Sequence, residues 1–255
     1  MIVLCECSSN PVTPTAARDA VAGALQAGGK AFVRVPDLCR AVARRSPALQ
    51  RLAGNGPLTI VACHPRAVSE LLRAAGVPVA GRDLLVLNMR SDGLADLVVR
   101  AIARPDGDGA AWPLEDPADP WVPWFPVIDY GRCQHCRQCL SFCLFGVYDA
   151  AADGRVVVAN PSNCKTNCPA CARICPTIAI MFPKFGGDPI NGAAIVDELS
   201  QRERVRIDVE KILGENPYAA LAARRAKRRL LVQEQASGQA AARQPAAGGG
   251  TGSAT

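Results

Sequence analysis

The sequence predicts an α/β N-terminal domain, with a small parallel sheet and helices, followed by a small α+β domain rich in cysteine. Two observations lead to this fold class. Short apolar runs alternate with helical patterns over residues 1–104, as in parallel sheets whose strands are joined by helices. Eight of the 12 cysteines then fall between Cys133 and Cys175. We divide the chain into an α/β domain (residues 1–104), a connector (105–126) and a cysteine-rich domain (127–183). An extended segment with a helical basic tail (184–236) and a disordered tail (237–255) follow.

The N-terminal domain should contain strands and helices in alternation. Residues 58–63 form an unbroken apolar run, which is typical of a parallel strand covered on both faces. Pro36 and Pro65 stand where helices can begin. The expected strands cover residues 2–4, 31–35, 58–63 and 83–87, and the expected helices cover 15–26, 36–44, 65–75 and 95–103.

Residues 105–126 interrupt this alternation with Gly and Pro, and they carry all three tryptophans, Trp112, Trp121 and Trp124. Because tryptophan buries a large apolar area, we expect this connector to pack against one or both neighbouring domains; an exposed linker is the alternative. Helical patterns follow later in the chain, over residues 193–213 and 217–233. The end of the chain from residue 237 is rich in Gly, Ala and Ser and should be disordered.

The N-terminus has neither the basic segment nor the long apolar run of a secretory signal. No stretch approaches the roughly 18 apolar residues of a membrane helix. We therefore expect a cytoplasmic protein. Thiols stay reduced in that compartment, so clustered cysteines are expected to be metal ligands rather than disulfides. The net charge of +6 is a mild basic excess.

The cysteines of the second domain form two closely spaced groups. The first is Cys133-x2-Cys136-x2-Cys139-x3-Cys143, and the second is Cys164-x3-Cys168-x2-Cys171-x3-Cys175, followed by Pro176. Three cysteines in a tight loop can hold three corners of a [4Fe–4S] cube, while a fourth leaves on a short helix. Zinc is the alternative, but structural zinc sites use well-separated pairs of cysteines. Strand-like residues 146–148 and 155–158 between the groups predict a hairpin.

This segment resembles the bacterial two-[4Fe–4S] ferredoxin domain over residues 127–183. The resemblance implies an α+β ferredoxin-like fold, two [4Fe–4S] clusters and one-electron transfer. It also implies crossed ligation, in which each group gives its last cysteine to the other cluster. Cluster 1 would take Cys133, Cys136, Cys139 and Cys175, and cluster 2 would take Cys143, Cys164, Cys168 and Cys171. The sequence departs from the family pattern at Leu144, where proline is usual, and in the third spacer residue between Cys164 and Cys168.

Four more cysteines, Cys5, Cys7, Cys39 and Cys63, lie in the N-terminal domain. Three of them fall at the ends of predicted strands or in the turns directly after them, and the carboxyl ends of parallel strands meet at one edge of a sheet. Through Leu4-Cys5-Glu6-Cys7 and Val61-Ala62-Cys63-His64-Pro65, residues 1–100 resemble the N-terminal region of the heterodisulfide reductase flavin subunit, although no flavin-binding Gly-x-Gly-x-x-Gly segment is present. That resemblance implies a third iron–sulfur cluster on these four cysteines. Small buried thiols at strand ends are the alternative.

Other polar residues near the motifs are weaker candidates. His64 and His135 are expected to be a strand-end residue and a spacer rather than ligands. Cations beside the ligand loops would raise the reduction potential of a nearby cluster and attract an acidic partner protein. These cations are Arg132, Arg137, Lys165 and Arg173. The basic run at residues 224–229 lies on a predicted helix without interleaved aromatics. This favours an exposed face, or a dock for an acidic protein, over a nucleic-acid site.

The sequence therefore predicts an iron–sulfur electron-transfer protein that relays single electrons between cytosolic redox enzymes through two [4Fe–4S] clusters. We expect a redox protein partner with an acidic docking face, and neither nucleic acid nor a membrane span. One alternative is the electron-input subunit of a heterodisulfide-reductase-like oxidoreductase, with a catalytic or third-cluster site in the N-terminal domain. Another is a non-catalytic iron–sulfur sensor or nucleic-acid-binding protein. An electron carrier or oxidoreductase subunit is expected rather than an enzyme in its own right.

Overall fold

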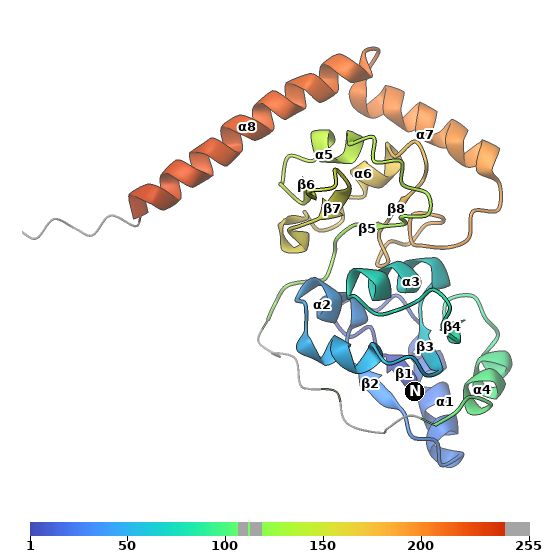
Figure 1. Ribbon diagram of the computed structural model, residues 1–255. Coiled ribbons are helices and arrows are strands. Elements are labelled where there is room, and N and C mark those ends of the chain that lie inside the picture. The colour runs from blue at the N-terminus through green and yellow to red at the C-terminus, as the bar shows by residue number, and fades with distance from the viewer. Residues whose placement is uncertain (107–111, 113–118, 243–255) are drawn as a thin grey trace, which may run out of the picture.

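The computed structural model describes residues 1–106, Trp112 and residues 119–242 (Figure 1). The N-terminal part contains a four-stranded sheet in the order β2–β1–β3–β4, formed by β1 (Ile2–Cys5), β2 (Val33–Val35), β3 (Leu58–Ala62) and β4 (Leu84–Asn88). All three strand pairs are parallel, and Val3 lies beside both Val33 and Ile60. The predicted small parallel sheet with helices is confirmed.

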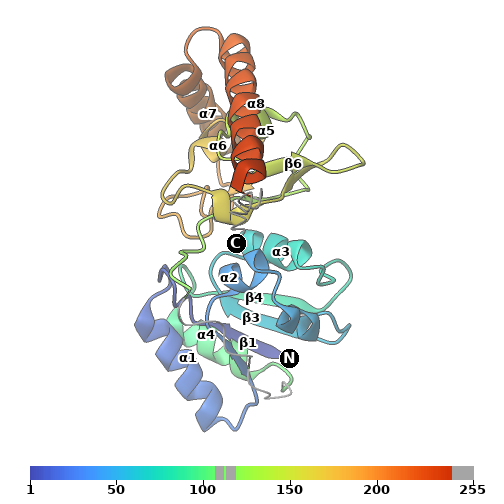
Figure 2. The same cartoon turned by 90° about the vertical axis from the view of Figure 1, so that its left-hand side faces the viewer.

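Helices cover both faces of this sheet (Figure 2). α1 (Thr15–Ala27) and α4 (Leu94–Ile102) pack on one face, where they bury Ile2 and Leu4. α2 (Leu38–Ala43), the 3-10 helix η1 (Pro47–Leu52) and α3 (Pro65–Ala74) pack on the other face, where Val3 and Cys5 point. Because side chains alternate along a strand, Cys5 is directed toward the face that α2 and α3 cover.

The cysteine-rich part is built from short elements. They are β5 (Val127–Ile128), α5 (Gln138–Phe142), β6 (Tyr148–Ala150), β7 (Val156–Val158), the 3-10 helix η2 (Pro161–Asn163), α6 (Ala170–Arg173) and β8 (Ile180–Met181). β5 pairs antiparallel with β8, and β6 pairs antiparallel with β7. The second pair is the hairpin expected between the two cysteine groups, and Gly154, at φ 82°, supplies the left-handed residue in its turn.

The β5–β8 pair lies between the two parts of the molecule (Figure 1). Val127 and Met181, which are cross-strand partners, belong to the hydrophobic core of the N-terminal part. Their neighbours Ile128 and Ile180, also partners, belong to the core of the cysteine-rich part. This two-stranded ladder therefore contributes one face to each core, and the division into two separate domains stays a prediction.

The aromatic residues of the connector pack against both cores. Trp112 and Phe125 are buried in the N-terminal core. Trp124 is buried in the other core and stacks on Phe182, with ring centroids 5.4 Å apart. The guanidinium of Arg44 lies 4.7 Å from the ring centroid of Trp121. These contacts agree with a packed connector; residues 107–111 and 113–118 lie outside the described part of the chain.

Two helices, α7 (Glu198–Leu213) and α8 (Pro217–Ala242), follow the cysteine-rich part. The Asp197 side chain caps α7 by accepting from the Ser200 N–H at 3.0 Å, so this helix begins later than the predicted residue 193. α8 continues through helix-forming Gln and Ala to Ala242, beyond the predicted end at residue 233. Residues 243–255 of the expected disordered tail lie outside the described residues. No helix in the described ranges is long and apolar enough to cross a membrane.

Candidate metal centres

Four cysteines from separate segments of the cysteine-rich part line one cavity of about 230 Å³. They are Cys143, Cys164, Cys168 and Cys171, and we call this group the second cluster site. Cys143 directly follows α5, whereas Cys171 lies on α6. The remaining walls are mostly apolar and include Pro126, Phe142 and Val147. The last cysteine of the first sequence group therefore meets three cysteines of the second group.

The other four cysteines also come together; we call Cys133, Cys136, Cys139 and Cys175 the first cluster site. Burial is the main cause that raises the pKa of Cys139 to about 12, and repulsion from the neighbouring Cys175, Cys136 and Cys133 raises it further. The pKa of Cys133 is also raised, by burial first and then by Cys175 and Cys136, against a lowering hydrogen bond from the His135 backbone. Cys175 thus neighbours the first sequence group, which is the arrangement that crossed ligation requires.

Left-handed backbone lets the ligand loops turn tightly. His135 and Arg137 have φ values of 54° and 61° between cysteines of the first group. In the second group the extra spacer residue is accommodated by a turn in which the Cys168 N–H donates to the Lys165 carbonyl at 3.1 Å. Asn167, at φ 63°, takes the left-handed position, which asparagine tolerates better than most residues. Cys164 consequently still lines the cavity despite the irregular spacing.

Hydrogen bonds reach two of these sulfurs from residues outside the ligand set. The Tyr148 hydroxyl donates to Cys171 Sγ at 3.1 Å, and the Ala179 N–H donates to Cys175 Sγ at 3.4 Å. Burial, followed by repulsion from Cys171, raises the pKa of Tyr148, so its hydroxyl keeps the proton that it donates. Hydrogen bonds to sulfur are one of the factors that set the potential of an iron–sulfur cluster. Sequence reasoning missed Tyr148, because nothing in the local pattern places it beside Cys171.

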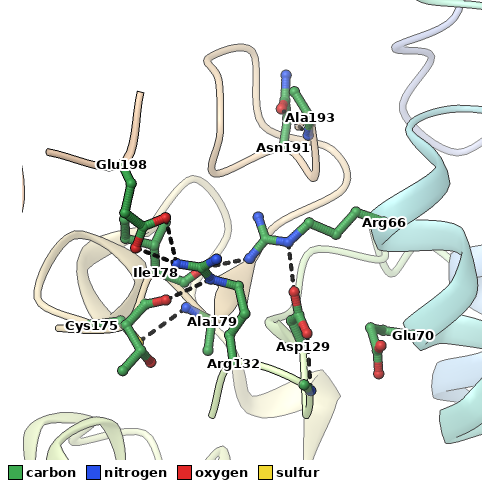
Figure 3. Close-up of polar contacts among 12 residues, drawn as sticks. Arg66, Glu70, Asp129, Arg132, Cys175, Ile178, Ala179, Asn191, Ala193 and Glu198 are labelled. Atoms are coloured by element: carbon green, nitrogen blue, oxygen red, sulfur yellow. Dashed lines mark hydrogen bonds and ion pairs between the residues drawn. The ribbon is translucent and has the colours of Figure 1, made fainter. Parts of the chain in front are cut away.

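Two arginines, each paired with a carboxylate, contact the turn that follows Cys175 (Figure 3). Arg66, on α3, contacts the Asp129 carboxylate at 2.7 Å and also donates to the carbonyl of Ile178. Arg132 donates to the Thr177 carbonyl at 2.8 Å and contacts Glu198 at 2.6 Å. Arg132, one of the cations expected beside the ligand loops, therefore contacts the Cys175 turn and the start of α7.

The N-terminal cysteines converge as the parallel topology predicts. Cys5, Cys7, Cys39 and Cys63, here called the N-terminal cysteine site, line one cavity of about 10 Å³ together with Asp37 and Lys184. Cys5 ends β1, Cys63 follows β3, and Cys39 lies in the first turn of α2. The Leu38 N–H at the start of α2 donates to Cys5 Sγ at 3.4 Å.

Lys184 is a residue of this site that the sequence did not reveal. It follows β8 of the cysteine-rich part, yet its side chain is only 2% exposed and contacts Asp37, which is fully buried, at 2.6 Å. Its ammonium also donates to Cys7 Sγ at 2.8 Å and to the Asn10 carbonyl at 3.1 Å. Burial lowers the pKa of Lys184, but attraction from Cys39 and Cys7 when they are ionised, and from the Asp37 carboxylate, outweighs it, so the pKa is raised and the ammonium stays cationic.

Burial raises the pKa of three of the four N-terminal thiols, those of Cys5, Cys39 and Cys63. For Cys63, burial is the main cause that raises the pKa to about 11. The donor set suits an iron–sulfur cluster, since such clusters use four thiolates. The space of about 10 Å³ is that of roughly one water, so a cluster there would require the surrounding side chains to move apart.

Neither histidine lines one of the two cysteine cavities, and each contacts another residue. His64 Nδ1 lies 3.0 Å from Asn88 Nδ2. His135 Nδ1 accepts from the Val156 N–H at 3.3 Å and lies 3.7 Å from Cys133 Sγ. Across residues 1–106, 112 and 119–242, no three His, Cys, Asp or Glu side chains are arranged to hold a single metal ion.

Comparison with known proteins identifies the cysteine-rich part. Residues 125–182 match the family of 4Fe–4S dicluster domains. An uncharacterised ferredoxin of Methanocaldococcus jannaschii is 51% identical over 63 residues, which cover 24% of this chain and 42% of that relative. The match thus spans less than half of the relative's length. No solved structure matches the chain. The chain carries a 4Fe–4S ferredoxin domain, as the sequence predicts, while the family match begins at residue 125 and leaves the resemblance of residues 1–100 untested.

Proposed function

We propose that this protein relays single electrons through two [4Fe–4S] clusters, between redox partners in the cytoplasm. The cavity shared by Cys143, Cys164, Cys168 and Cys171 is the observation that carries the proposal, because its four thiols and apolar walls suit a cubane cluster. The first cluster site would hold the other cluster. When bound, the clusters supply the one-electron chemistry; the chain supplies the thiolates, the hydrogen bonds to sulfur and the surrounding charges.

Crossed ligation would tie the two clusters into one unit. Cys143 and Cys175 each lie with the cysteines of the opposite sequence group, so each segment would contribute to both clusters. This arrangement supports transfer between the clusters, because the same short helices and loops hold both of them. Exposed Arg137, Lys165 and Arg173 beside the ligand loops support an acidic docking face on the partner.

Iron analysis and two substitutions test this proposal. Anaerobically prepared protein should contain about eight irons and eight sulfides from the ferredoxin domain. Cys175→Ala should damage the cluster of Cys133, Cys136 and Cys139, and Cys143→Ala should damage the opposite cluster. Stoichiometric zinc without sulfide would reject the iron–sulfur assignment. Loss in Cys175→Ala that is confined to the cluster of Cys164, Cys168 and Cys171 would reject the crossing.

A second candidate is the electron-input subunit of a heterodisulfide-reductase-like oxidoreductase. The convergence of Cys5, Cys7, Cys39 and Cys63 favours it, since four thiols beside a buried cation could hold a third cluster or a reactive cysteine pair. The sensor or nucleic-acid alternative would use the basic run of α8. There, however, Arg225 contacts Ser141 at 2.6 Å and Arg228 contacts the Leu140 carbonyl at 3.0 Å, so these side chains are directed toward α5.

A further inference from the structure

The basic run of α8 lies against the second cluster site. Arg224 lines the same cavity as Cys143, Cys164, Cys168 and Cys171. Its guanidinium carbon lies 4.3 Å from the ring centroid of Phe142, which is also part of the cavity wall. Among the described residues that line this cavity, Arg224 is the one Arg, Lys, Asp or Glu.

Two neighbouring arginines hold α8 in this position. Arg225 Nε donates to Ser141 Oγ at 2.6 Å. Arg228 donates to the carbonyls of Leu140 and Tyr148, both at 3.0 Å. Ser141 and Leu140 belong to α5, the helix that leads into Cys143. These contacts hold the Arg224 backbone beside the cavity, and the contact with Phe142 places its guanidinium at the cavity wall.

Such a cation has a definite effect on a cluster. A cube with four thiolates is anionic in both oxidation states and gains one more negative charge on reduction. A positive charge held beside the cavity therefore stabilises the reduced form more than the oxidised form, because charges attract across the short distance to the cluster.

We propose that Arg224 raises the reduction potential of the cluster at the second cluster site and so makes the two clusters unequal. The proposal rests on the two-cluster function above. One electron moves from the reduced cluster of the first site to the oxidised cluster of the second, and no bond or proton changes. At equilibrium a single electron therefore resides mainly on the cluster at the second cluster site.

The test is a redox titration of the full-length protein, prepared anaerobically and followed by paramagnetic resonance. R224Q should lower the reduction potential of one cluster by about 59 mV, which for one electron is a tenfold change in the equilibrium constant for reduction. The other potential should not move. The matched control is K227Q, because Lys227 lies on the same helix, is exposed and does not line the cavity. A cysteine-to-serine change at Cys168 identifies the affected signal as that of the second site.

A second pair of variants separates charge from packing. R224K keeps the charge and R224M removes it, with side chains of similar length. We expect R224K to retain the wild-type potential and R224M to match R224Q. Equal potentials in R224K and R224M, or a shift of the first cluster instead, would overturn the proposal. If iron and sulfide analysis finds fewer than two clusters in the wild-type protein, the proposed function itself is refuted. Two clusters whose potentials do not change in R224Q would refute only the role of Arg224.

Discussion

At the residue scale, the hydroxyl of Tyr148 donates to Cys171 Sγ inside a fully buried environment. Tyr148→Phe removes this hydrogen bond but keeps the ring in the core. We expect the second cluster's potential to fall by on the order of 40 mV, because a net hydrogen bond is worth about 1 kcal/mol. Redox titration measures the shift.

Tyr130→Phe is the matched control, because the Tyr130 hydroxyl donates to the Val156 carbonyl at 3.1 Å and not to a sulfur. Both variants lose one hydroxyl from the cysteine-rich part, but only one loses a donor to a proposed ligand. A similar shift in the two variants, or none in Tyr148→Phe, would show that the bond to Cys171 does not tune the cluster.

The buried thiols of the N-terminal cysteine site should make folding stability depend on pH in protein whose metal has been removed with a chelator. Burial raises the pKa of Cys63 to about 11 from its usual 9.0, so the unfolded chain releases this proton first. The folded state then binds more protons between these values, and stability falls as pH rises from about 9 to 11. Each such thiol contributes up to about 1.4 kcal/mol per pH unit.

Hydrogen exchange of the β1 and β3 amides, measured on stripped and reduced protein, reports this loss locally. Cys63→Ser is the control, since a hydroxyl does not titrate in that range and the slope should become shallower. Stability that is constant or rises over the same pH range would contradict the buried, protonated state of the thiol.

At the element scale, α3 and the Cys175 turn are joined through Arg66. Ile178 has φ 53°, a left-handed value that is unfavourable for a β-branched residue. Arg66 donates to its carbonyl, and the next residue, Ala179, donates its N–H to Cys175 Sγ (Figure 3). The helix therefore holds a strained turn in the position that presents a donor to the first cluster site.

Arg66→Gln should loosen this turn and make the first cluster more labile. We expect iron release to a chelator to accelerate severalfold for the first cluster, with the second cluster less affected. The measurement is absorbance loss under anaerobic conditions. Arg73→Gln is the control, because Arg73 lies on the same helix, is 46% exposed and pairs with Glu70, at 3.5 Å, on that helix. Equal release rates in both variants would argue against the role of Arg66.

Periodicity and cysteine spacing predicted the parallel sheet, the hairpin and the grouping of the cysteines, because these features depend on local pattern and on parallel topology. The same reasoning could not find Tyr148, Lys184 or Arg224. Each reaches a cysteine site through a contact distant in sequence; Lys184, for example, meets Cys7 across 177 positions. The basic run of α8 was expected at the surface because its charge is visible in the sequence, whereas its packing on α5 is not.

At the scale of the whole molecule, contacts from both parts converge on the N-terminal cysteine site. The β5–β8 ladder adds Val127 and Met181 to the N-terminal core, and Lys184 follows β8 directly into the cavity. Arg90 of the N-terminal part donates to the Phe185 carbonyl at 3.2 Å, one residue beyond Lys184. The site is thus assembled from the α/β sheet and from the end of the ferredoxin domain, which is the arrangement expected if electrons pass between them.

This assembly leads to the last prediction, made for the full-length chain because Lys184 lies outside the N-terminal part. If the N-terminal cysteine site holds a third cluster, anaerobically reconstituted protein should contain about four more irons than the variant Cys7→Ser/Cys63→Ser. Iron and sulfide analysis gives the difference, and the resonance spectrum of the two ferredoxin clusters should be unchanged. Serine substitution of Cys136 is the control, since it should alter that spectrum and leave the additional iron in place. Equal iron content in wild type and the double variant would show that these cysteines hold no third cluster and are buried thiols beside the Lys184–Asp37 pair.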